Sequence, residues 1–236
     1  MSYVYFRLPH SCPVVRKRLS TYPDEIASRA SLHARRGFVI APFAPSDDCP
    51  ILLLPTEWEE VDLNFSGDNQ NGEQTHLSSN DGVSAMLLDA DYEKERQRYA
   101  VDFHNYHGQL TNDAFQKIVL ARCARLTATE KLSPLTLFAR ACHRYPRMFV
   151  ALFSTERSGT WLIATPETLI SGTNGAMQTM ALAGTMRLSG ANLDFDVEGG
   201  SIGKDDIRWS TKNIKEQRYV ETYITECVEK YSDWVL

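Results

Sequence analysis

A lysine lies near the start of a strongly apolar stretch, residues 115–126, which reads FQKIVLARCARL. With the two-residue period of a β-strand, Lys117 shares one face with small or apolar side chains, among them Val119 and Cys123. An amine on such a face would be poorly hydrated, which favours its neutral form and suits it to general-base chemistry. The alternative is that Lys117 lies at an exposed strand end and extends its ammonium group into water.

A turn signal later in the chain places a carboxylate near the open end of a hairpin. The dipeptide Asn174-Gly175 lies between two runs of strand-forming residues, which predicts a two-residue turn with Thr173 facing Ala176. In that register Glu167 lies at the open end of the hairpin. The carboxylate would lie beside residues 183–185, and the alternative is an ordinary exposed glutamate.

The returning strand of this hairpin runs into Ala183-Gly184-Thr185, beside the predicted place of Glu167. Gly184 would let a ligand approach the backbone closely. Thr185 offers a hydroxyl and a main-chain N–H to an anionic group. The alternative is a glycine-containing turn with no ligand.

A third carboxylate lies on the apolar side of a predicted helix. Ser210 or Thr211 caps this helix, and its apolar stripe begins at Val220. Glu216 lies four residues before Val220, on the same stripe. A carboxylate that faces inward needs a metal ion, an arginine or hydrogen-bond donors, unless the helix dipole alone stabilises it.

The composition limits the class of protein. The chain has 236 residues, 43% of them hydrophobic, and 30 acidic against 25 basic residues give a net charge of -5. No run of lysine or arginine forms a stripe suited to phosphate backbones, so we expect no nucleic-acid partner. No GxGxxG, GxxxxGK[ST] or GxSxG motif supports nucleotide binding or serine-hydrolase chemistry.

Cysteine usage and the length of the apolar runs indicate the compartment. The 5 cysteines are odd in number, scattered and never arranged as CxxC, which favours buried free thiols in a reducing cytoplasm. The N-terminus lacks the layout of a signal peptide, and no apolar run approaches the roughly 20 residues that span a bilayer. We therefore expect a soluble, cytoplasmic protein without a membrane partner.

The chain shows two unequal regions. Residues 1–90 contain short apolar runs broken by proline, which predicts strands near sheet edges. These runs are Val4–Leu8, Phe38–Phe43 and Ile51–Leu54. Residues 62–82 have almost nothing to bury, which predicts a mobile loop or a linker.

Residues 91–236 alternate between helices and hairpins. Apolar residues recur at spacings of three and four from Tyr92 to Leu110, which predicts an amphipathic helix with Gly108 near its end. A second helix begins after Ser133, has proline in its first position and ends near Pro146. The strands MFVALFST and WLIATPETLI follow, joined by a Ser-Gly turn. This alternation predicts an α+β fold.

Four motifs occur in order along the chain: FQKIVLAR, ATPETL, ALAGT and STKNIKEQ. Together they resemble the chorismate-utilising enzymes, and most closely the isochorismate synthases. The resemblance covers residues 92–230, and GFVIAPF near the N-terminus is also similar to those synthases. It implies packed antiparallel sheets with outer helices, in which residues 1–90 form a strand-rich region and residues 91–236 the N-terminal part of the catalytic domain.

The resemblance implies a role for most of the candidate residues. Lys117 matches the lysine that activates water for attack at C2 of chorismate, and Glu167 matches the glutamic acid that protonates the departing C4 hydroxyl. Ala183, Gly184 and Thr185 match the segment that holds a substrate carboxylate. A base and an acid would thus act on opposite sides of one ring.

The resemblance also implies a cofactor. Glu216 matches one of the glutamates that bind Mg²⁺ in these enzymes. A hard cation held by oxygen ligands would neutralise and orient a charged substrate. We therefore expect chorismate as the small-molecule substrate and Mg²⁺ as the cofactor.

Two positions discriminate between members of the family. Anthranilate synthases carry glutamine where this chain has Lys117, because their nucleophile is ammonia. Aminodeoxychorismate synthases place a lysine where Ala183 stands. The resemblance therefore favours an isochorismate synthase of quinone or siderophore biosynthesis. The alternatives are a salicylate synthase, which adds pyruvate elimination to the same first step, and a non-catalytic chorismate-binding remnant.

Two departures from the family pattern carry expectations of their own. The family usually has glycine where this chain has Ile163, which would narrow the pocket or only repack the strand. The family's domain continues beyond the STKNIKEQ-like motif, so the resemblance implies that residues 91–236 are its first part. Sheet edges and apolar faces would then be uncovered, and we expect self-association, which light scattering would detect as particles larger than a monomer.

Overall fold

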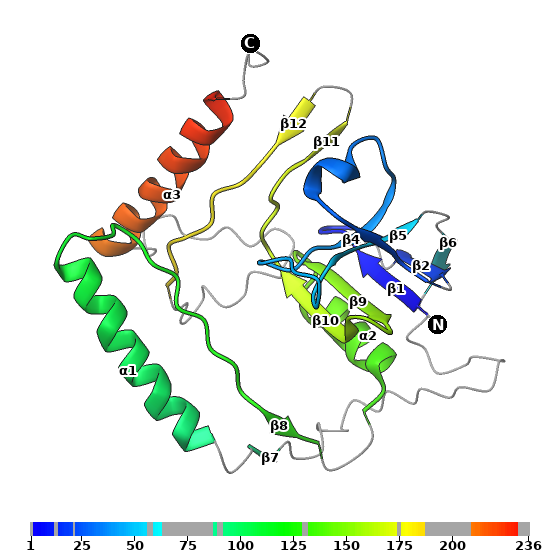
Figure 1. The fold of residues 1–236 in the computed structure, drawn as a ribbon, viewed down its shortest axis with the longest axis horizontal. Coiled ribbons are helices and arrows are strands. Elements are labelled where there is room, and N and C mark those ends of the chain that lie inside the picture. Colours follow the sequence, from blue (N-terminus) through cyan, green and yellow to red (C-terminus); the bar gives the residue numbers. More distant parts are fainter. Residues whose placement is uncertain are drawn as a thin grey trace, which may run out of the picture. The chain divides into compact units, whose positions relative to one another are not determined.

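The computed structural model describes residues 2–11, 14–20, 22–55, 59–62, 87–88, 92–128, 132–173, 176–186 and 209–230 (Figure 1). These residues combine helices with antiparallel sheets, as the predicted α+β class requires. The chain divides into two compact units, of which unit 1 holds residues 1–107 and 120–166 and unit 2 holds residues 108–119 and 167–236. No helix in the described part of the chain is long and apolar enough to span a lipid bilayer.

Unit 1 is built on a five-stranded antiparallel sheet of order β10-β9-β1-β2-β6. Its strands are β1 (Ser2–Arg7), β2 (Val14–Ser20), β6 (Glu59–Asp62), β9 (Phe149–Thr155) and β10 (Gly159–Thr165). Strand β1 lies in the middle, where Val4 pairs with Phe153 on one side and Arg18 on the other. Its predicted edge position is therefore wrong. Pro9 follows β1 rather than interrupting it, so no ladder hydrogen bond is lost. The two units also do not separate at residue 90, because β1 and β9 share this sheet.

A second sheet in unit 1 has three strands in the order β3-β5-β4. They are β3 (Asp24–Ile26), β4 (Gly37–Ile40) and β5 (Ile51–Pro55), and a short 3-10 helix, Arg29–Leu32, follows β3. Strand β5 is central, again contrary to the predicted edge position. Its apolar run ILLL is almost completely buried, because side chains on both faces of a central strand meet neighbouring layers.

Helix α2 (Pro134–Arg144) covers one face of the five-stranded sheet (Figure 1). The hydroxyl of Ser133 accepts the N–H of Thr136 at 3.3 Å, and proline occupies the first helical position, so the predicted start is confirmed. Phe138 and Leu152 belong to one buried cluster between helix and sheet, with exposed fractions of 0% and 1%. Burying two side chains of this size stabilises the contact by roughly 2 kcal/mol each.

The opposite face of the five-stranded sheet packs against the three-stranded sheet. Val4 and Phe153 form a buried cluster with Leu54 of β5. The ring of Phe38 lies 5.8 Å from that of Phe6 and 5.9 Å from that of Phe153, measured between centroids. Unit 1 therefore has three layers: a helix, a five-stranded sheet and a three-stranded sheet.

A buried arginine binds the chain that follows α2. Arg7 is only 3% exposed, and its guanidinium donates to the carbonyls of Tyr145 and Pro146, the second at 2.6 Å. It also donates to the carbonyl of Met148 at 3.0 Å. These acceptors lie at the C-terminal end of α2, where the helix dipole favours a cation. Arg7 thus joins β1 to the end of α2.

A cysteine in α2 shares this buried environment. Burial raises the pKa of the Cys142 thiol above its ordinary value of 9.0, and the Arg7 guanidinium lowers this pKa only in part. We expect iodoacetamide at neutral pH to label the exposed Cys49 and Cys123 in the native protein and to leave Cys142 unmodified, as peptide mass spectrometry would show. Rapid labelling of native Cys142 would contradict the buried position.

The same thiol predicts a pH dependence of stability. The folded pKa of Cys142 is raised, so the neutral thiol is favoured in the folded state. Well below pH 9 the thiol is neutral in both states and contributes no pH dependence. As the pH rises further the unfolded thiol ionises first, and the free energy of unfolding falls. A Cys142→Ser variant, measured by denaturant titration, should show less of this alkaline loss.

Unit 2 contains a hairpin and a long helix. The hairpin strands are β11 (Ser171–Thr173) and β12 (Ala176–Gln178), and the helix is α3 (Thr211–Glu229). Thr173 pairs with Ala176, so the predicted register is confirmed, although the turn dipeptide itself lies outside the described residues. The Ser210 hydroxyl accepts the N–H of Asn213 at 3.1 Å, so Ser210 is the cap of α3.

Helix α1 (Tyr92–Thr111) runs from unit 1 into unit 2 and confirms the predicted helix. Its apolar side chains are largely exposed, with Val101 at 61% and Phe103 at 54%. The ring of Phe103 stacks on that of Tyr99, and the guanidinium of Arg122 lies 6.0 Å from the Tyr99 ring centroid. Such contacts cover part of the helix with aromatic and cationic groups.

The described part of unit 2 contains no buried hydrophobic side chain, since those that are buried among the described residues all belong to unit 1. Leu169 is 90% exposed, Val119 78% and Met177 59%. Apolar side chains exposed together favour association with another surface. The self-association expected above stays a prediction for light scattering.

Candidate functional site

Residues 116–125 do not form the predicted strand. Only Leu126–Thr127 (β8) is paired in this part of the chain, with Leu87–Leu88 (β7). A two-residue period sets which side chains share a face, but it supplies no neighbouring strand to complete the hydrogen bonds. Val119 is 78% exposed and Cys123 is also exposed, so the apolar face expected around Lys117 does not form.

Helix α3 shields Lys117 instead. The Nζ atom of Lys117 lies 3.4 Å from Oε1 of Glu216, and the two side chains are 22% and 30% exposed. Both residues belong to unit 2. In the described part of the chain, therefore, the inward-facing carboxylate has an ammonium group as its partner. An ion pair this far removed from water is worth more than the surface average, because solvent screens it less.

The segment at residues 181–184 lies along the second turn of α3. The side-chain oxygen of Gln217 accepts the N–H of Ala183 at 3.0 Å and the N–H of Gly184 at 3.3 Å. Its Nε2 donates to the carbonyl of Ala181 at 2.7 Å. One glutamine side chain thus makes three hydrogen bonds to the backbone of a segment with no regular structure of its own.

Asn213, one turn earlier, holds the next residue. Its Nδ2 donates to the carbonyl of Thr185 at 2.7 Å. The hydroxyl and the N–H of Thr185 have no partner within the described part of the chain. Asn213 and Gln217 were not predicted as site residues. Their four-residue spacing puts two amides on one helical face, which is a signal that the motif KNIKEQ does contain.

Glu167 lies after β10, at the start of the second segment of unit 2, and is exposed. The hairpin ladder ends at the pair Ser171 and Gln178, so strand pairing does not continue to Glu167. The structure brings together Lys117 and Glu216 and joins α3 to residues 181–185. The approach of Glu167 to these residues stays a prediction.

Gly184 is required by the close approach of α3. A Cβ atom at this position would lie 2.9 Å from the backbone oxygen of Asn213 and 3.2 Å from the ring of Trp209. We therefore expect Gly184→Ala to push the segment away from α3 and to lower the free energy of unfolding by about 1–3 kcal/mol. Thermal denaturation would measure this loss of stability.

Gly108→Ala is the matched control for this prediction. The same added Cβ at Gly108, in helix α1, would meet nothing within 4 Å. Alanine has the higher helix propensity, so this variant should be neutral or more stable by about 0.5–1 kcal/mol. Equal effects of the two substitutions would contradict the close approach of α3 to Gly184.

The structure also shows what Ile163 does. It lies in β10, where its backbone pairs with Ala151, and its side chain packs against the cluster of Val4, Leu54 and Phe153. This packing supports the expectation that Ile163 repacks the strand, rather than the expectation that it narrows the pocket. Ile163 fills space between the two sheets of unit 1.

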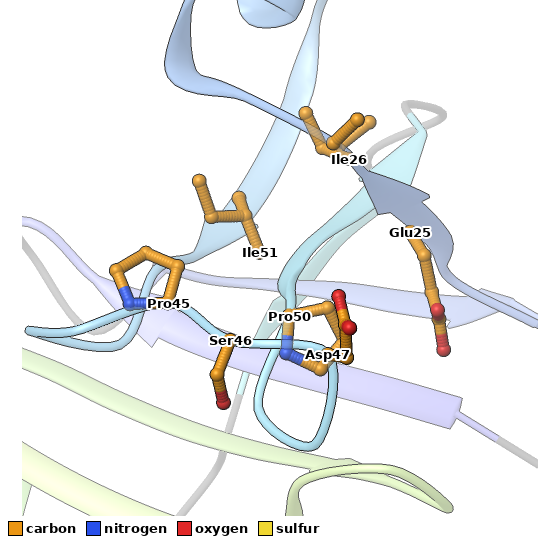
Figure 2. Close-up of a pocket in the computed structure, with 8 residues that line it drawn as sticks. Glu25, Ile26, Pro45, Ser46, Asp47, Pro50 and Ile51 are labelled. Carbon is orange, nitrogen blue, oxygen red and sulfur yellow. The ribbon is translucent and has the colours of Figure 1, made fainter.

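A cavity of about 390 Å³ lies in unit 1, between β3 and the loop that leads into β5 (Figure 2). None of the candidate residues lines it. Its charged side chains include the carboxylates of Glu25 and Asp47, and Arg157 donates to the Glu25 carboxylate at 2.9 Å. Two carboxylates against one arginine give a poor environment for a substrate that itself carries carboxylates.

The described residues contain no group of three or more His, Cys, Asp or Glu side chains that could hold a metal ion. Glu216 offers one partly exposed carboxylate, which already binds a cationic group. Mg²⁺ is usually bound through one or two carboxylates, with water and substrate oxygens completing its shell. Glu216 has the oxygen chemistry of one such ligand, and its binding of Mg²⁺ stays a prediction.

These features define a class of protein: a mixed α and β chain in which a lysine and a glycine-threonine segment contact one helix that carries a carboxylate. The family described as chorismate binding enzyme matches residues 56–236. The chain belongs to this family of enzymes, which use chorismate. No curated protein and no solved structure matches the chain.

Proposed function

We propose that this protein is an isochorismate synthase, which converts chorismate to isochorismate with the help of Mg²⁺. The observation that carries the proposal is the contact of Lys117 with Glu216 on the same helix that holds residues 181–185. A base, a metal ligand and a carboxylate-binding segment are the parts that this reaction needs. Family membership supports chorismate as the substrate.

Lys117 has the role of general base. Its amine accepts a proton from a water molecule, whose oxygen then bonds to C2 of chorismate. An amine must be uncharged to do this. In the proposed reaction Lys117 therefore acts as the neutral amine, beside Glu216.

Glu167 has the role of general acid. As the bond from water to C2 forms, the ring double bonds shift and the bond from C4 to its hydroxyl breaks. Glu167 gives a proton to the departing hydroxyl, which leaves as water. One water enters and one leaves, so substrate and product are isomers.

Thr185 and Glu216 bind the substrate's charge. The hydroxyl and N–H of Thr185, which have no partner among the described residues, offer two hydrogen bonds to a substrate carboxylate. Glu216 would be one ligand of Mg²⁺, which neutralises the negative charge of the substrate when bound. Removal of the ion with a chelator should therefore abolish turnover.

An isotope experiment tests this proposal. The protein is incubated with chorismate and Mg²⁺ in ¹⁸O-water, and the product is identified by NMR and mass spectrometry. We expect isochorismate that carries one ¹⁸O atom at C2. The absence of any product would contradict the proposed reaction, as would a product without the label.

The same experiment separates the alternatives. Salicylate and pyruvate in place of isochorismate would show that the first step is followed by elimination, which is the salicylate synthase reaction. Chorismate that binds but is recovered unchanged would assign the chain to the non-catalytic alternative. NMR identifies the product, mass spectrometry measures the label, and calorimetry measures the binding of chorismate that is not converted.

A further inference from the structure

We propose that Gln217 is a positioning residue for substrate binding: its side-chain amide fixes the backbone of residues 181–184, so that Thr185 is presented to the substrate carboxylate. The inference rests on the proposed function for its substrate. We call the three hydrogen bonds from the Gln217 side chain to residues 181, 183 and 184 the clamp. The clamp depends only on contacts within unit 2. These contacts are made by α3 and a segment that has no regular secondary structure.

The three hydrogen bonds of Gln217 satisfy backbone groups of a segment that has no strand partner of its own among the described residues. The side-chain oxygen accepts two N–H groups and Nε2 donates to a carbonyl two residues earlier, so the amide completes backbone groups that a sheet would otherwise complete. Gln217 and the residues it binds at 181, 183 and 184 are partly buried. Leaving such groups without partners costs about 1–3 kcal/mol for each group.

The clamp also decides which N–H groups a ligand can use. The N–H groups of Ala183 and Gly184 are occupied by Gln217. The next N–H along the segment, that of Thr185, has no partner in the described part of the chain. A substrate carboxylate is therefore directed to Thr185 rather than to the glycine, and the sequence motif alone does not make this distinction.

Asn213 and Gly184 make the clamp rigid. The Asn213 side chain donates to the carbonyl of Thr185 at 2.7 Å. This carbonyl follows Thr185 in the chain, whereas the groups that Gln217 binds precede Thr185. Gly184 itself lies so close to α3 that an added Cβ would be 2.9 Å from the Asn213 backbone oxygen. Both ends of the segment are thus fixed to one helix, which preserves the direction of the Thr185 groups.

The variant Gln217→Met tests the clamp, because methionine has a similar length and makes none of the three hydrogen bonds. In the full chain we expect amide hydrogen exchange at Ala183 and Gly184 to accelerate at least about tenfold. The Kd for chorismate should rise by about tenfold, the effect of losing one well-placed hydrogen bond. If the wild type turns over, KM should rise while kcat changes little.

Two further variants keep the test decisive. Gln97→Met makes the same substitution at an exposed position of α1 and should alter neither exchange at residues 181–185 nor the Kd. Asn213→Ala removes a different contact of the same segment and should raise the Kd in the same direction. It replaces Gln217→Met as the test if circular dichroism shows that the methionine variant does not fold.

The outcomes separate the clamp from the proposed function. Unchanged exchange in Gln217→Met would overturn the clamp, whether or not chorismate is the substrate. Faster exchange with an unchanged Kd would overturn the positioning role. A wild-type protein that neither binds nor converts chorismate would contradict the proposed function. It would also contradict the role of Gln217 in positioning that substrate.

Discussion

Replacing Lys117 by arginine should abolish turnover while chorismate still binds. Arginine keeps a positive charge beside Glu216, so the ion pair and the local packing are preserved. A guanidinium group is always protonated and cannot accept a proton from water. We therefore expect Lys117→Arg and Lys117→Ala both to lower kcat by about 10²–10⁴-fold, the usual contribution of a general base.

The pair of variants distinguishes chemistry from structure. If Lys117 served only to pair with Glu216, then Lys117→Arg would retain activity and Lys117→Ala would lose it. Lys215→Ala is the control, because Lys215 is exposed on α3 next to Glu216 and should leave kcat unchanged. Substantial activity in Lys117→Arg would contradict the proposed base. Steady-state rates and calorimetric chorismate binding provide both measurements.

Replacing Arg7 by methionine should cause the largest loss of stability that we predict. The guanidinium is 3% exposed and binds three carbonyl groups at the end of α2, and methionine would leave those groups buried without donors. We expect the free energy of unfolding to fall by about 3 kcal/mol, since hydrogen bonds from a charged donor are the strong ones. Denaturant titration followed by circular dichroism measures the change.

A surface arginine gives the comparison for this prediction. Arg36 is exposed between the 3-10 helix and β4, and Arg36→Met should change stability by less than about 0.5 kcal/mol. Arg7→Lys keeps the charge but cannot reach three acceptors in one plane, so it should lie between the two methionine variants. An Arg7→Met protein as stable as Arg36→Met would show that the carbonyls find other partners.

The elements that local signals define were predictable from the sequence. Ser133 and the proline after it define the start of α2, and Ser210 caps α3. The dipeptide Asn174-Gly175 gave the correct pairing of Thr173 with Ala176. Each of these signals acts over a few residues, through a cap or a turn, so the rest of the chain is not needed to interpret it.

Elements that depend on distant partners were not predictable in the same way. FQKIVLAR has the composition of a strand, yet the partner that Lys117 meets in the described structure is Glu216 on a helix. Strand β1 lies at the centre of its sheet because β9 pairs with it, and no local pattern in β1 reveals this. The period of a strand fixes its faces, but tertiary contacts decide which neighbours complete its hydrogen bonds.

In the candidate site, too, local signals identified single residues, whereas contacts between distant residues were not predictable. Lys117 and Glu216 were identified separately, one from an apolar stretch and one from a helical stripe, and their contact appeared only in the structure. Gln217 lies next to Glu216 in the sequence but was not identified. Its four-residue spacing from Asn213 puts two amides on one helical face, but the spacing does not distinguish a clamp from two solvated side chains. The role of Gln217 depends on the three backbone groups that it meets.

A chorismate titration followed by amide NMR tests the central claim most directly. The claim is that unit 2 binds chorismate through α3 and residues 181–185. With ¹⁵N-labelled protein and Mg²⁺ present, we expect the largest shift changes at Thr185 and its neighbours, together with residues around Lys117 and Glu216, and with small changes in the sheets of unit 1. Shift changes confined to unit 1, or none at saturating chorismate, would contradict the account.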